Sequence, residues 1–172
     1  NLQANPAFFR DPESSGWMYI LRGYRLPGYP EAETVHISPE NPEIRFSDPS
    51  SNRYIREGFY PPEPWGRQAK QTPIRLFFSS PTSPESVAFA LHSNEETELS
   101  FYLNETLVHE TTIPKTPWSM KEVSFEIPSD FWRKKAINEF EIRSSYPGGY
   151  AAASRDLRFT TLALATIRFH FP

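Results

Sequence analysis

Residues 99–108, Leu-Ser-Phe-Tyr-Leu-Asn-Glu-Thr-Leu-Val, contain the pattern that decides the fold. Leu99, Phe101 and Leu103 alternate with more polar neighbours, which is the period-two pattern of a strand with one buried face. The Asn-Glu pair that follows interrupts the alternation and marks a turn. Hairpins of this kind usually have glycine where Glu105 stands, so the sequence does not require a type I′ turn. We therefore predict an antiparallel hairpin here.

The same alternation recurs on both sides of this hairpin. Apolar residues share one face in four further segments: 74–78, 87–91, 123–127 and 139–143. In the last of these, Glu139, Glu141 and Arg143 are expected on the wet face. Clusters of Pro, Ser, Asn and Gly separate the segments, as turns do. About eight short strands at regular spacing predict an all-β fold, an antiparallel two-sheet β-sandwich of jelly-roll type.

The segment 157–171 differs from the others because its middle is apolar on both faces. One parity includes Phe159, Ala163, Ile167, Phe169 and Phe171, and Leu162 and Leu164 lie on the other. A strand buried on both sides is typical of a central position in a sheet, and the change of parity favours a bend or bulge. We therefore predict a central strand here.

The N-terminal part reads as helical and irregular rather than β. Asp11-Pro12-Glu13 is a helix-start pattern, and an apolar stripe at helical spacing follows from Trp17 to Tyr24. We predict a short helix within an arm, residues 1–42, packed on a sandwich of residues 43–172, in a single domain overall. A second helical turn is predicted over 131–135, capped by Ser129 or Asp130.

Composition excludes several classes of protein. The chain has 172 residues, enough for one core, and no cysteine, so disulfides and cysteine metal sites are excluded. A net charge of −3 argues against nucleic acid and anionic membranes as partners. No apolar run approaches the ~18 residues of a membrane helix, so this segment is not expected to insert in a bilayer. Because the first residue is asparagine and no signal peptide is seen, we expect a piece of a longer protein.

Several segments resemble galactose-binding-like jelly rolls, the carbohydrate-binding-module-like domains. The hairpin 99–108 is similar to theirs, and so is the pair 125–128 and 137–142, although Ile137 stands where the family has glycine. The stretch 58–67, Gly-Phe-Tyr-Pro-Pro-Glu-Pro-Trp-Gly-Arg, resembles the opening of jelly rolls appended to bacterial membrane enzymes of cell-envelope glycan assembly. Asp156-Leu157-Arg158 resembles their closing motif.

The resemblance implies a noncatalytic accessory domain rather than an enzyme. Its location would be extracytoplasmic, either periplasmic or at the cell surface. Its partners would be a carbohydrate and the rest of a larger membrane protein that processes cell-envelope glycans. Such a domain binds sugar or merely supports the neighbouring enzyme.

The richest group of binding side chains is Tyr60, Glu63, Trp65 and Arg67. Aromatic faces stack on the C–H side of a pyranose, and carboxylate and guanidinium groups bind its hydroxyls. In the alternative reading, Trp65 covers the core and Glu63 pairs with an arginine. Both readings fit a rigid, proline-rich loop.

Two further groups complete the predicted ligand site. Asp156 is expected to accept an arginine, either Arg67 or another, with Glu63 joining the network and Arg158 hydrogen-bonding the ligand. Tyr146 and Tyr150 flank Gly-Gly in a loop that would present a second aromatic edge. Trp118 and Trp132 stand beside turns, as either ligand platforms or core residues.

No catalytic or metal signature is present in the sequence. The four histidines lack ligand spacing, and nucleophile elbow, phosphate loop and dinucleotide fingerprint are all missing. We expect no cofactor, with a structural calcium held by loop carboxylates left open. Two other functions also stay open: an interaction module that docks through Phe8, Phe9, Trp17 and Tyr24, and a small glycan hydrolase that pairs Glu63 with Asp156 or Glu57.

Overall fold

The computed structural model describes residues 35–49, 51, 59–116, 119–134, 136–150 and 158–172. The predicted N-terminal helix lies outside these residues, as does most of the predicted arm. The described end of the arm contains β1 (Val35–His36), which pairs in parallel with β4 (Ile74–Ser79) and so joins the sandwich.

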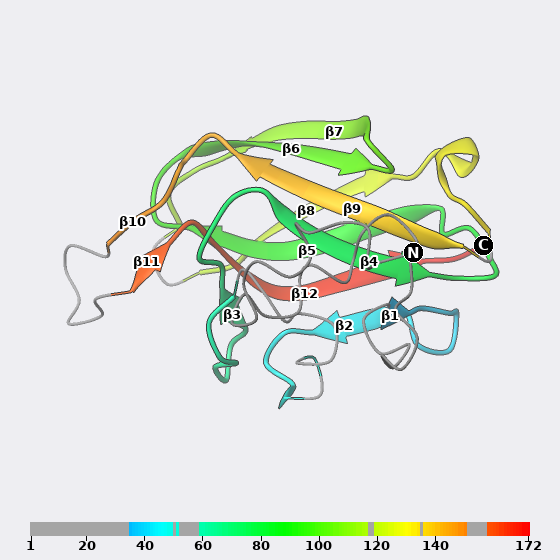
Figure 1. Ribbon diagram of the computed structural model, residues 1–172, viewed down its shortest axis with the longest axis horizontal. Coiled ribbons are helices and arrows are strands. Elements are labelled where there is room, and N and C mark those ends of the chain that lie inside the picture. The colour runs from blue at the N-terminus through cyan, green and yellow to red at the C-terminus, as the bar shows by residue number, and fades with distance from the viewer. Residues whose placement is uncertain (1–34, 50, 52–58, 117–118, 135, 151–157) are drawn as a thin grey trace, which may run out of the picture.

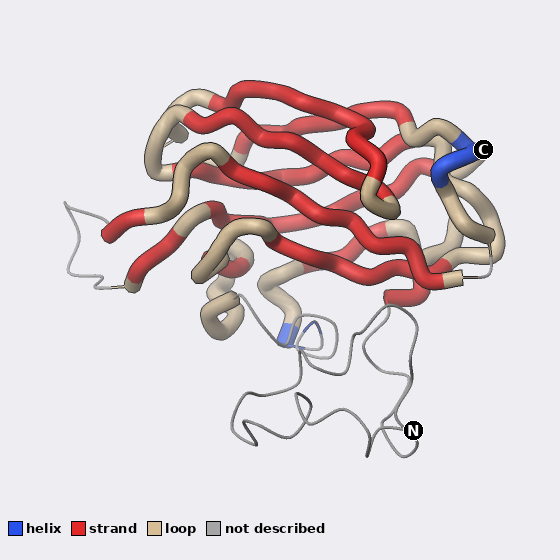
Figure 2. The backbone as a smooth tube through the Cα atoms, turned by 45° about the horizontal axis from the view of Figure 1, so that its top comes forward, coloured by secondary structure: helices blue, strands red, loops and turns tan. Residues whose placement is uncertain are grey.

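Two sheets form the domain, and Figures 1 and 2 show them as two stacked layers. Sheet I has the order β1, β4, β9 (Ile137–Ser144), β6 (Thr97–Leu103) and β7 (Thr106–Ile113). Sheet II has the order β2 (Glu43–Arg45), β12 (Leu162–His170), β5 (Ser86–Ser93) and β8 (Lys121–Glu126). Apart from β1 with β4, the paired strands are antiparallel. The predicted jelly-roll sandwich is confirmed.

Three further strands are short. β3 (Arg67–Gln68) belongs to sheet II through its pairing with β12, and β10 (Gly149–Tyr150) pairs with β11 (Phe159–Thr160) in a separate two-stranded ribbon. In Figure 1, β3, β10 and β11 lie toward the same end of the molecule. This end also receives the loop between β5 and β6 and the loop that leaves β9.

The core forms where the inward residues of both sheets meet. Those predicted from the alternation are all buried: Ile74, Leu76, Phe78, Val87, Phe89, Leu91, Leu99, Phe101, Leu103, Val123, Phe125, Ile127, Phe140 and Ile142. Phenylalanine rings join the layers, with 5.0 Å between the ring centroids of Phe89 and Phe101 and 5.0 Å between those of Phe78 and Phe169. Packing of apolar side chains thus replaces the disulfides that the chain lacks.

β12 is the central strand of sheet II and contains the predicted bulge. Its register against β5 shifts between Leu164 and Thr166, so Leu164 and Ile167 both face the core. The extra residue explains why the apolar pattern changes parity along this segment. Phe159 was predicted on the inward parity, but it belongs to β11, before β12 begins, and its side chain is 38% exposed.

The β6–β7 hairpin closes with both central residues in the left-handed region, as a type I′ turn requires. Asn104 has φ 51° and Glu105 has φ 71°. Asparagine tolerates this conformation, and its side-chain Nδ2 donates to the Phe131 carbonyl at 2.7 Å and to Asn138 Oδ1 at 2.9 Å. The turn is therefore held by a hydrogen bond between the half-buried Asn104 and the buried Asn138, without glycine at the second position.

The helical turn after β8 is shorter than predicted. A 3₁₀ turn spans Ser129–Phe131, and neither Ser129 nor Asp130 caps it with a side-chain hydrogen bond, so the predicted cap is wrong. The backbone just after the turn is instead held by Asn138, which is fully buried and whose Oδ1 accepts a hydrogen bond from the Arg133 N–H at 2.8 Å. Trp132 is buried against Phe169 and is a core residue, whereas Trp118 lies outside the described residues.

Candidate functional site

A tight turn before β3 presents Trp65 to solvent. The backbone groups of Glu63 and Gly66 exchange two hydrogen bonds, of 2.8 and 3.0 Å, which close the turn. Gly66 has φ 147°, and a Cβ there would overlap the Leu164 carbonyl oxygen and come 2.9 Å from the Cα of Ala165. Glycine is therefore needed for the turn to lie against β12. Trp65 projects from it with 38% of its surface exposed.

Glu63 ties this turn to the segment before β11. Its Oε2 accepts a hydrogen bond from the Trp65 indole N–H at 3.0 Å, and its Oε1 pairs with Arg158 Nη1 at 2.5 Å. Both carboxylate oxygens are thus engaged within the protein. The pairing of Glu63 with an arginine was predicted as one of two readings, and here it orients an exposed indole instead of burying it.

Tyr60 supports the same group from the strand side. Its hydroxyl donates to the Phe159 carbonyl at 3.1 Å. Two cations lie over its ring, Lys70 Nζ at 4.9 Å and Arg158 Cζ at 5.2 Å from the centroid. These contacts occupy the ring that was predicted to stack on a sugar, so Tyr60 positions Arg158 and the backbone of Phe159.

The ribbon of β10 and β11 adds two exposed rings. Tyr150 is 67% exposed and meets Phe159 edge-on, with ring centroids 5.5 Å apart and planes at 77°. Gly148 has φ 111°, and a Cβ there would come 2.5 Å from the Phe159 ring, so this loop also needs glycine. Phe159 was not predicted as an exposed residue of this cluster because its apolar type matched the core parity. The signal that could have found it is the polar Thr-Thr pair that separates it from β12.

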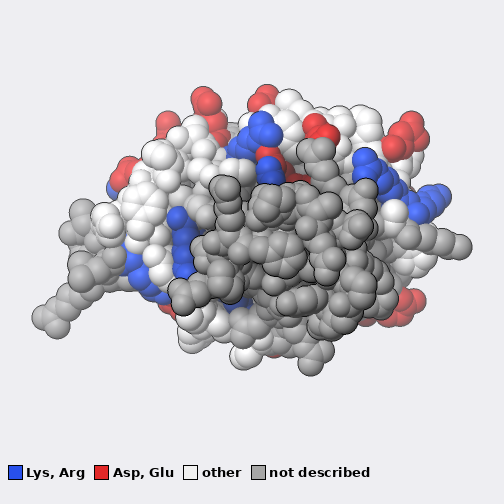
Figure 3. Space-filling model, viewed as in Figure 1, with Lys and Arg blue, Asp and Glu red and all other residues white. Residues whose placement is uncertain are grey.

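We call these residues the aromatic rim: Tyr60, Glu63, Trp65, Tyr150, Arg158 and Phe159. A chain of contacts joins Trp65 through Glu63, Arg158 and the residue after it to Tyr150. On the left of Figure 3, the corresponding end of the molecule shows basic side chains bordering uncharged surface. The rim combines exposed aromatic faces with fixed polar groups, which is what a carbohydrate site requires.

Tyr146 supports its loop and is only partly exposed. Its backbone N–H donates to Thr97 Oγ1 at 3.0 Å, and its carbonyl accepts from Ser144 Oγ at 3.1 Å. Burial raises the pKa of its hydroxyl, and the nearby Glu95 carboxylate raises it further. The hydroxyl lies where a Cβ on Gly149 would be, so Tyr146 packs beneath the loop that presents Tyr150.

Arg67, which was predicted to contact a ligand, does not lie on the rim. The side chain turns into the protein, where Nε donates to the Phe46 carbonyl at 3.0 Å and Nη2 donates to Ser51 Oγ at 2.8 Å. The residue is 2% exposed, and burial lowers the pKa of its guanidinium. Glu63 takes Arg158 as its partner. Asp156, predicted to join this network, lies outside the described residues.

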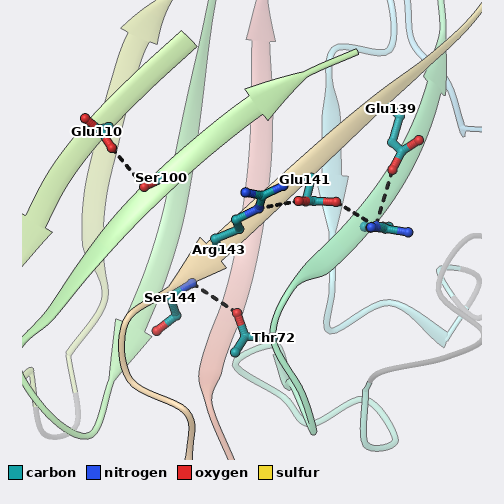
Figure 4. A network of polar contacts seen from close by, with 8 residues as sticks. Thr72, Ser100, Glu110, Glu139, Glu141, Arg143 and Ser144 are labelled. Carbon is teal, nitrogen blue, oxygen red and sulfur yellow. Dashed lines mark hydrogen bonds and ion pairs between the residues drawn. The ribbon is translucent and has the colours of Figure 1, made fainter. Parts of the chain in front are cut away.

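A second polar network lies on the outer face of sheet I (Figure 4). Glu141 pairs with Arg75 Nε at 2.7 Å and with Arg143 Nε at 2.5 Å, across β4 and β9. Glu141 was predicted on the wet face, but these arginines cover it and leave it 7% exposed. Burial would raise the pKa of Glu141, and the hydrogen bonds from Arg143 and Arg75 outweigh it and lower the pKa.

Within the described residues, no group of three histidine, aspartate or glutamate side chains is placed to hold a metal ion. Two of the histidines pair with hydroxyls, His36 with Ser79 at 2.6 Å and His92 with Thr116 at 3.1 Å. Glu57 lies outside the described part of the chain, as do the aromatic residues of the arm. None of the helices searched there is long and apolar enough to span a membrane.

No protein-family model matches the chain, and no curated protein matches it. Several solved structures are similar in fold. The module CsCBM6-3 from Clostridium stercorarium, solved with cellobiose, is 13% identical, with 81% of this chain and 98% of that chain covered and a TM-score of 0.43. A family 35 carbohydrate-binding module from an environmental isolate is 14% identical over 64% of this chain and 71% of that chain, with a TM-score of 0.40.

A Cry1Da tryptic core variant from Bacillus thuringiensis is also similar to this chain. It is 14% identical, with 80% of this chain covered but only 24% of that much longer chain, and its TM-score is 0.46. At such identities and scores the likeness concerns the sandwich alone. It assigns neither a ligand nor an activity to this chain.

Proposed function

We propose that this domain binds carbohydrate through the aromatic rim and performs no chemistry of its own. The observation that carries the proposal is the gathering of three exposed rings, those of Trp65, Tyr150 and Phe159, around one fixed ion pair. Exposed apolar side chains that cluster mark an interaction surface more often than those scattered singly. Aromatic rings beside polar donors suit a sugar, which has an apolar C–H face and a polar edge.

The rim is held in place before any ligand arrives. The Trp65 indole is oriented by its hydrogen bond to Glu63, and Glu63 is held in turn by Arg158. A ring that is already fixed loses little conformational freedom on binding, so more of the stacking energy is available for affinity. This preorganisation favours a binding site over an ordinary surface loop.

The state of Glu63 favours binding over hydrolysis. A glycosidase needs one carboxyl group as acid and a second as base or nucleophile, about 5–10 Å apart. Both oxygens of Glu63 are bonded to donors of the protein, so this carboxylate is poorly placed to transfer a proton.

We also propose a setting for this activity. The domain is extracytoplasmic and serves as an accessory to a larger envelope protein that processes glycans, without a cofactor. Support for this setting comes from the motif resemblance of residues 58–67 and 156–158. Binding to a partner protein through the aromatic arm is the competing proposal, and it predicts that no glycan binds.

A glycan array followed by calorimetry tests the proposal. We expect the chain to bind a glycan and Trp65→Ala to weaken binding at least about tenfold, because one stacking ring is lost. Leu107→Ala is the matched control, since Leu107 is also exposed (44%) but lies by the β6–β7 turn. Thermal unfolding should show both variants folded. Absence of binding to any glycan, or unchanged affinity of Trp65→Ala, would overturn the proposal.

A further inference from the structure

Lys70 stands beside the aromatic rim on a firmly held piece of backbone. The preceding residue, Ala69, is fully buried, and its N–H donates to the Leu162 carbonyl at 2.6 Å. Its carbonyl accepts from the Thr161 N–H at 3.0 Å. Lys70 itself is exposed, with Nζ 4.9 Å from the centroid of the Tyr60 ring. Among the described residues, no carboxylate forms an ion pair with it.

Among the described residues, two cations and one carboxylate lie around Tyr60. Lys70 and Arg158 both lie over its ring, and Glu63 is the carboxylate that the structure pairs with Arg158. The second carboxylate oxygen of Glu63 accepts a hydrogen bond from the Trp65 indole N–H. The described side chains of the rim with Lys70 therefore have one positive charge in excess, although the whole chain has a net charge of −3.

The basic pair on sheet I provides a contrast. Arg75 and Arg143 share the buried Glu141, and Arg75 also lies 3.4 Å from Glu139, so two carboxylates balance two guanidiniums. No exposed ammonium is left over in that network. Lys70, by contrast, lies over the half-buried ring of Tyr60 in the aromatic rim and has no carboxylate partner among the described residues.

A ligand at the rim meets aromatic faces and donors, with the carboxylate already used. Neutral sugars bind best where a site offers acceptors as well as donors for their hydroxyl groups. An ammonium favours an anionic acceptor, since charge-assisted hydrogen bonds are the stronger ones. We propose that the rim selects acidic sugars, uronic acids whose ring stacks on Trp65, Phe159 or Tyr150 while the carboxylate pairs with Lys70. This inference rests on the proposed function.

Uronate polymers and their carboxyl-reduced forms are the matched probes. Polygalacturonate, alginate and glucuronoxylan would each be compared with the reduced polymer by affinity electrophoresis and calorimetry, using the full chain. We expect at least one acidic polymer to bind about tenfold more tightly than its reduced form. Raising the salt concentration from about 0.05 to 0.5 M should weaken the binding of the acidic polymer and leave the binding of its reduced form unchanged.

The variant K70M separates charge from stacking. It should bind the acidic and reduced polymers equally, because the rings of the rim stay in place. K115M is the matched control, since Lys115 is also exposed but pairs with Glu95 at 2.9 Å on another loop, and it should keep the preference.

The possible results distinguish this inference from the proposed function. Equal binding of acidic and reduced polymers, an unchanged preference in K70M, or binding to neutral glycans only would overturn the selection of acidic sugars and leave carbohydrate binding intact. If neither these polymers nor any glycan on the array is bound, both proposals fail.

Discussion

Two glutamates of this domain, Glu63 and Glu141, each accept two hydrogen bonds from side chains, but the bonds hold different parts of the structure in place. Each accepts from two donors, Glu63 from Trp65 and Arg158, Glu141 from Arg75 and Arg143. Glu141 lies in the middle of β9, and its partners extend from the same sheet. Glu63 lies in a turn, and Arg158 comes from a segment 95 residues away.

The difference lies in what each carboxylate holds. The ion pair of Glu141 with Arg75 joins β9 to β4, and Arg143 on β9 covers the neighbouring ring of Tyr102, with 4.1 Å from its Cζ to the ring centroid. The pairs of Glu63 hold a turn whose indole stays open to solvent. A polar network alone therefore does not mark a binding site. The proposed function rests instead on an exposed ring that such a network fixes in place.

Removing the support beneath the rim should have the largest effect. Gly66→Ala forces a side chain into a left-handed conformation and against the backbone of β12, so we expect it to lower the free energy of unfolding by about 2–4 kcal/mol and to abolish glycan binding. Gly149→Ala is the control, because its Cβ would approach only the Tyr146 side chain, whose hydroxyl end can shift, and it should change stability by less than about 1 kcal/mol. Urea denaturation measures the free energy of unfolding of both variants. Equal losses of stability would show that the turn does not require glycine at position 66 more than at 149.

Exchanging the two carboxylates for amides should separate the two networks. Glu141→Gln weakens two ion pairs between a buried carboxylate and exposed arginines, and should lower the free energy of unfolding by about 2 kcal/mol without affecting glycan binding. Glu63→Gln weakens one ion pair of a less buried carboxylate, so its stability loss should stay below about 1 kcal/mol while glycan affinity falls. Stability comes from urea denaturation and affinity from calorimetry. A stability loss in Glu63→Gln larger than that in Glu141→Gln would reverse our assignment.

Acid should weaken the sheet I network. The folded-state pKa of Glu141 is lowered, so its stabilisation is complete above the unfolded carboxyl pKa, about 4.3, and is lost as the pH falls through the folded value. We expect the free energy of unfolding to decrease less steeply below about pH 4 in Glu141→Gln than in the unaltered chain. Parallel pH profiles of the two proteins would contradict this prediction.

Replacing each of two tyrosines by alanine should give the smallest changes in stability and should distinguish the rim from the sheet I network. Tyr150→Ala should alter stability by less than about 0.5 kcal/mol, because Tyr150 is largely exposed, and should weaken glycan binding several-fold. Tyr102→Ala removes the ring beneath Arg143, so stability should fall by about 1 kcal/mol while affinity stays unchanged. Thermal unfolding and calorimetry compare the two. Identical profiles would mean that neither ring belongs to a ligand site.

Most of the fold could be predicted from the sequence because alternation is a local signal. The strands of Phe78, Phe89 and Phe101 each repeat their buried residue every second position. The parity change in β12 also predicted its bulge. Phe159 was misplaced because residue type alone does not reveal where a strand begins, and the β10–β11 ribbon ends just before β12.

The site was predicted only where its residues are close in sequence, because contacts between distant segments leave no local pattern. Trp65 and Glu63 are two residues apart, so their association could be inferred from the chain. The direction of Arg67 depends on Phe46 and Ser51, which approach it only in the folded state. The burial of Glu141 likewise depends on Arg75 from a neighbouring strand, which no local pattern predicts.

The shape of the Trp65 turn depends on β12, a strand that pairs with segments from distant parts of the chain. This strand lies under Gly66, pairs with β2, β3 and β5, and places Arg168 beside Glu43, 125 residues away in the chain. The Trp65 turn therefore acquires its shape only when both ends of the described chain have come together. On the proposed function, retention on an immobilised glycan would select, from a library of variants, those molecules in which the whole sandwich has assembled.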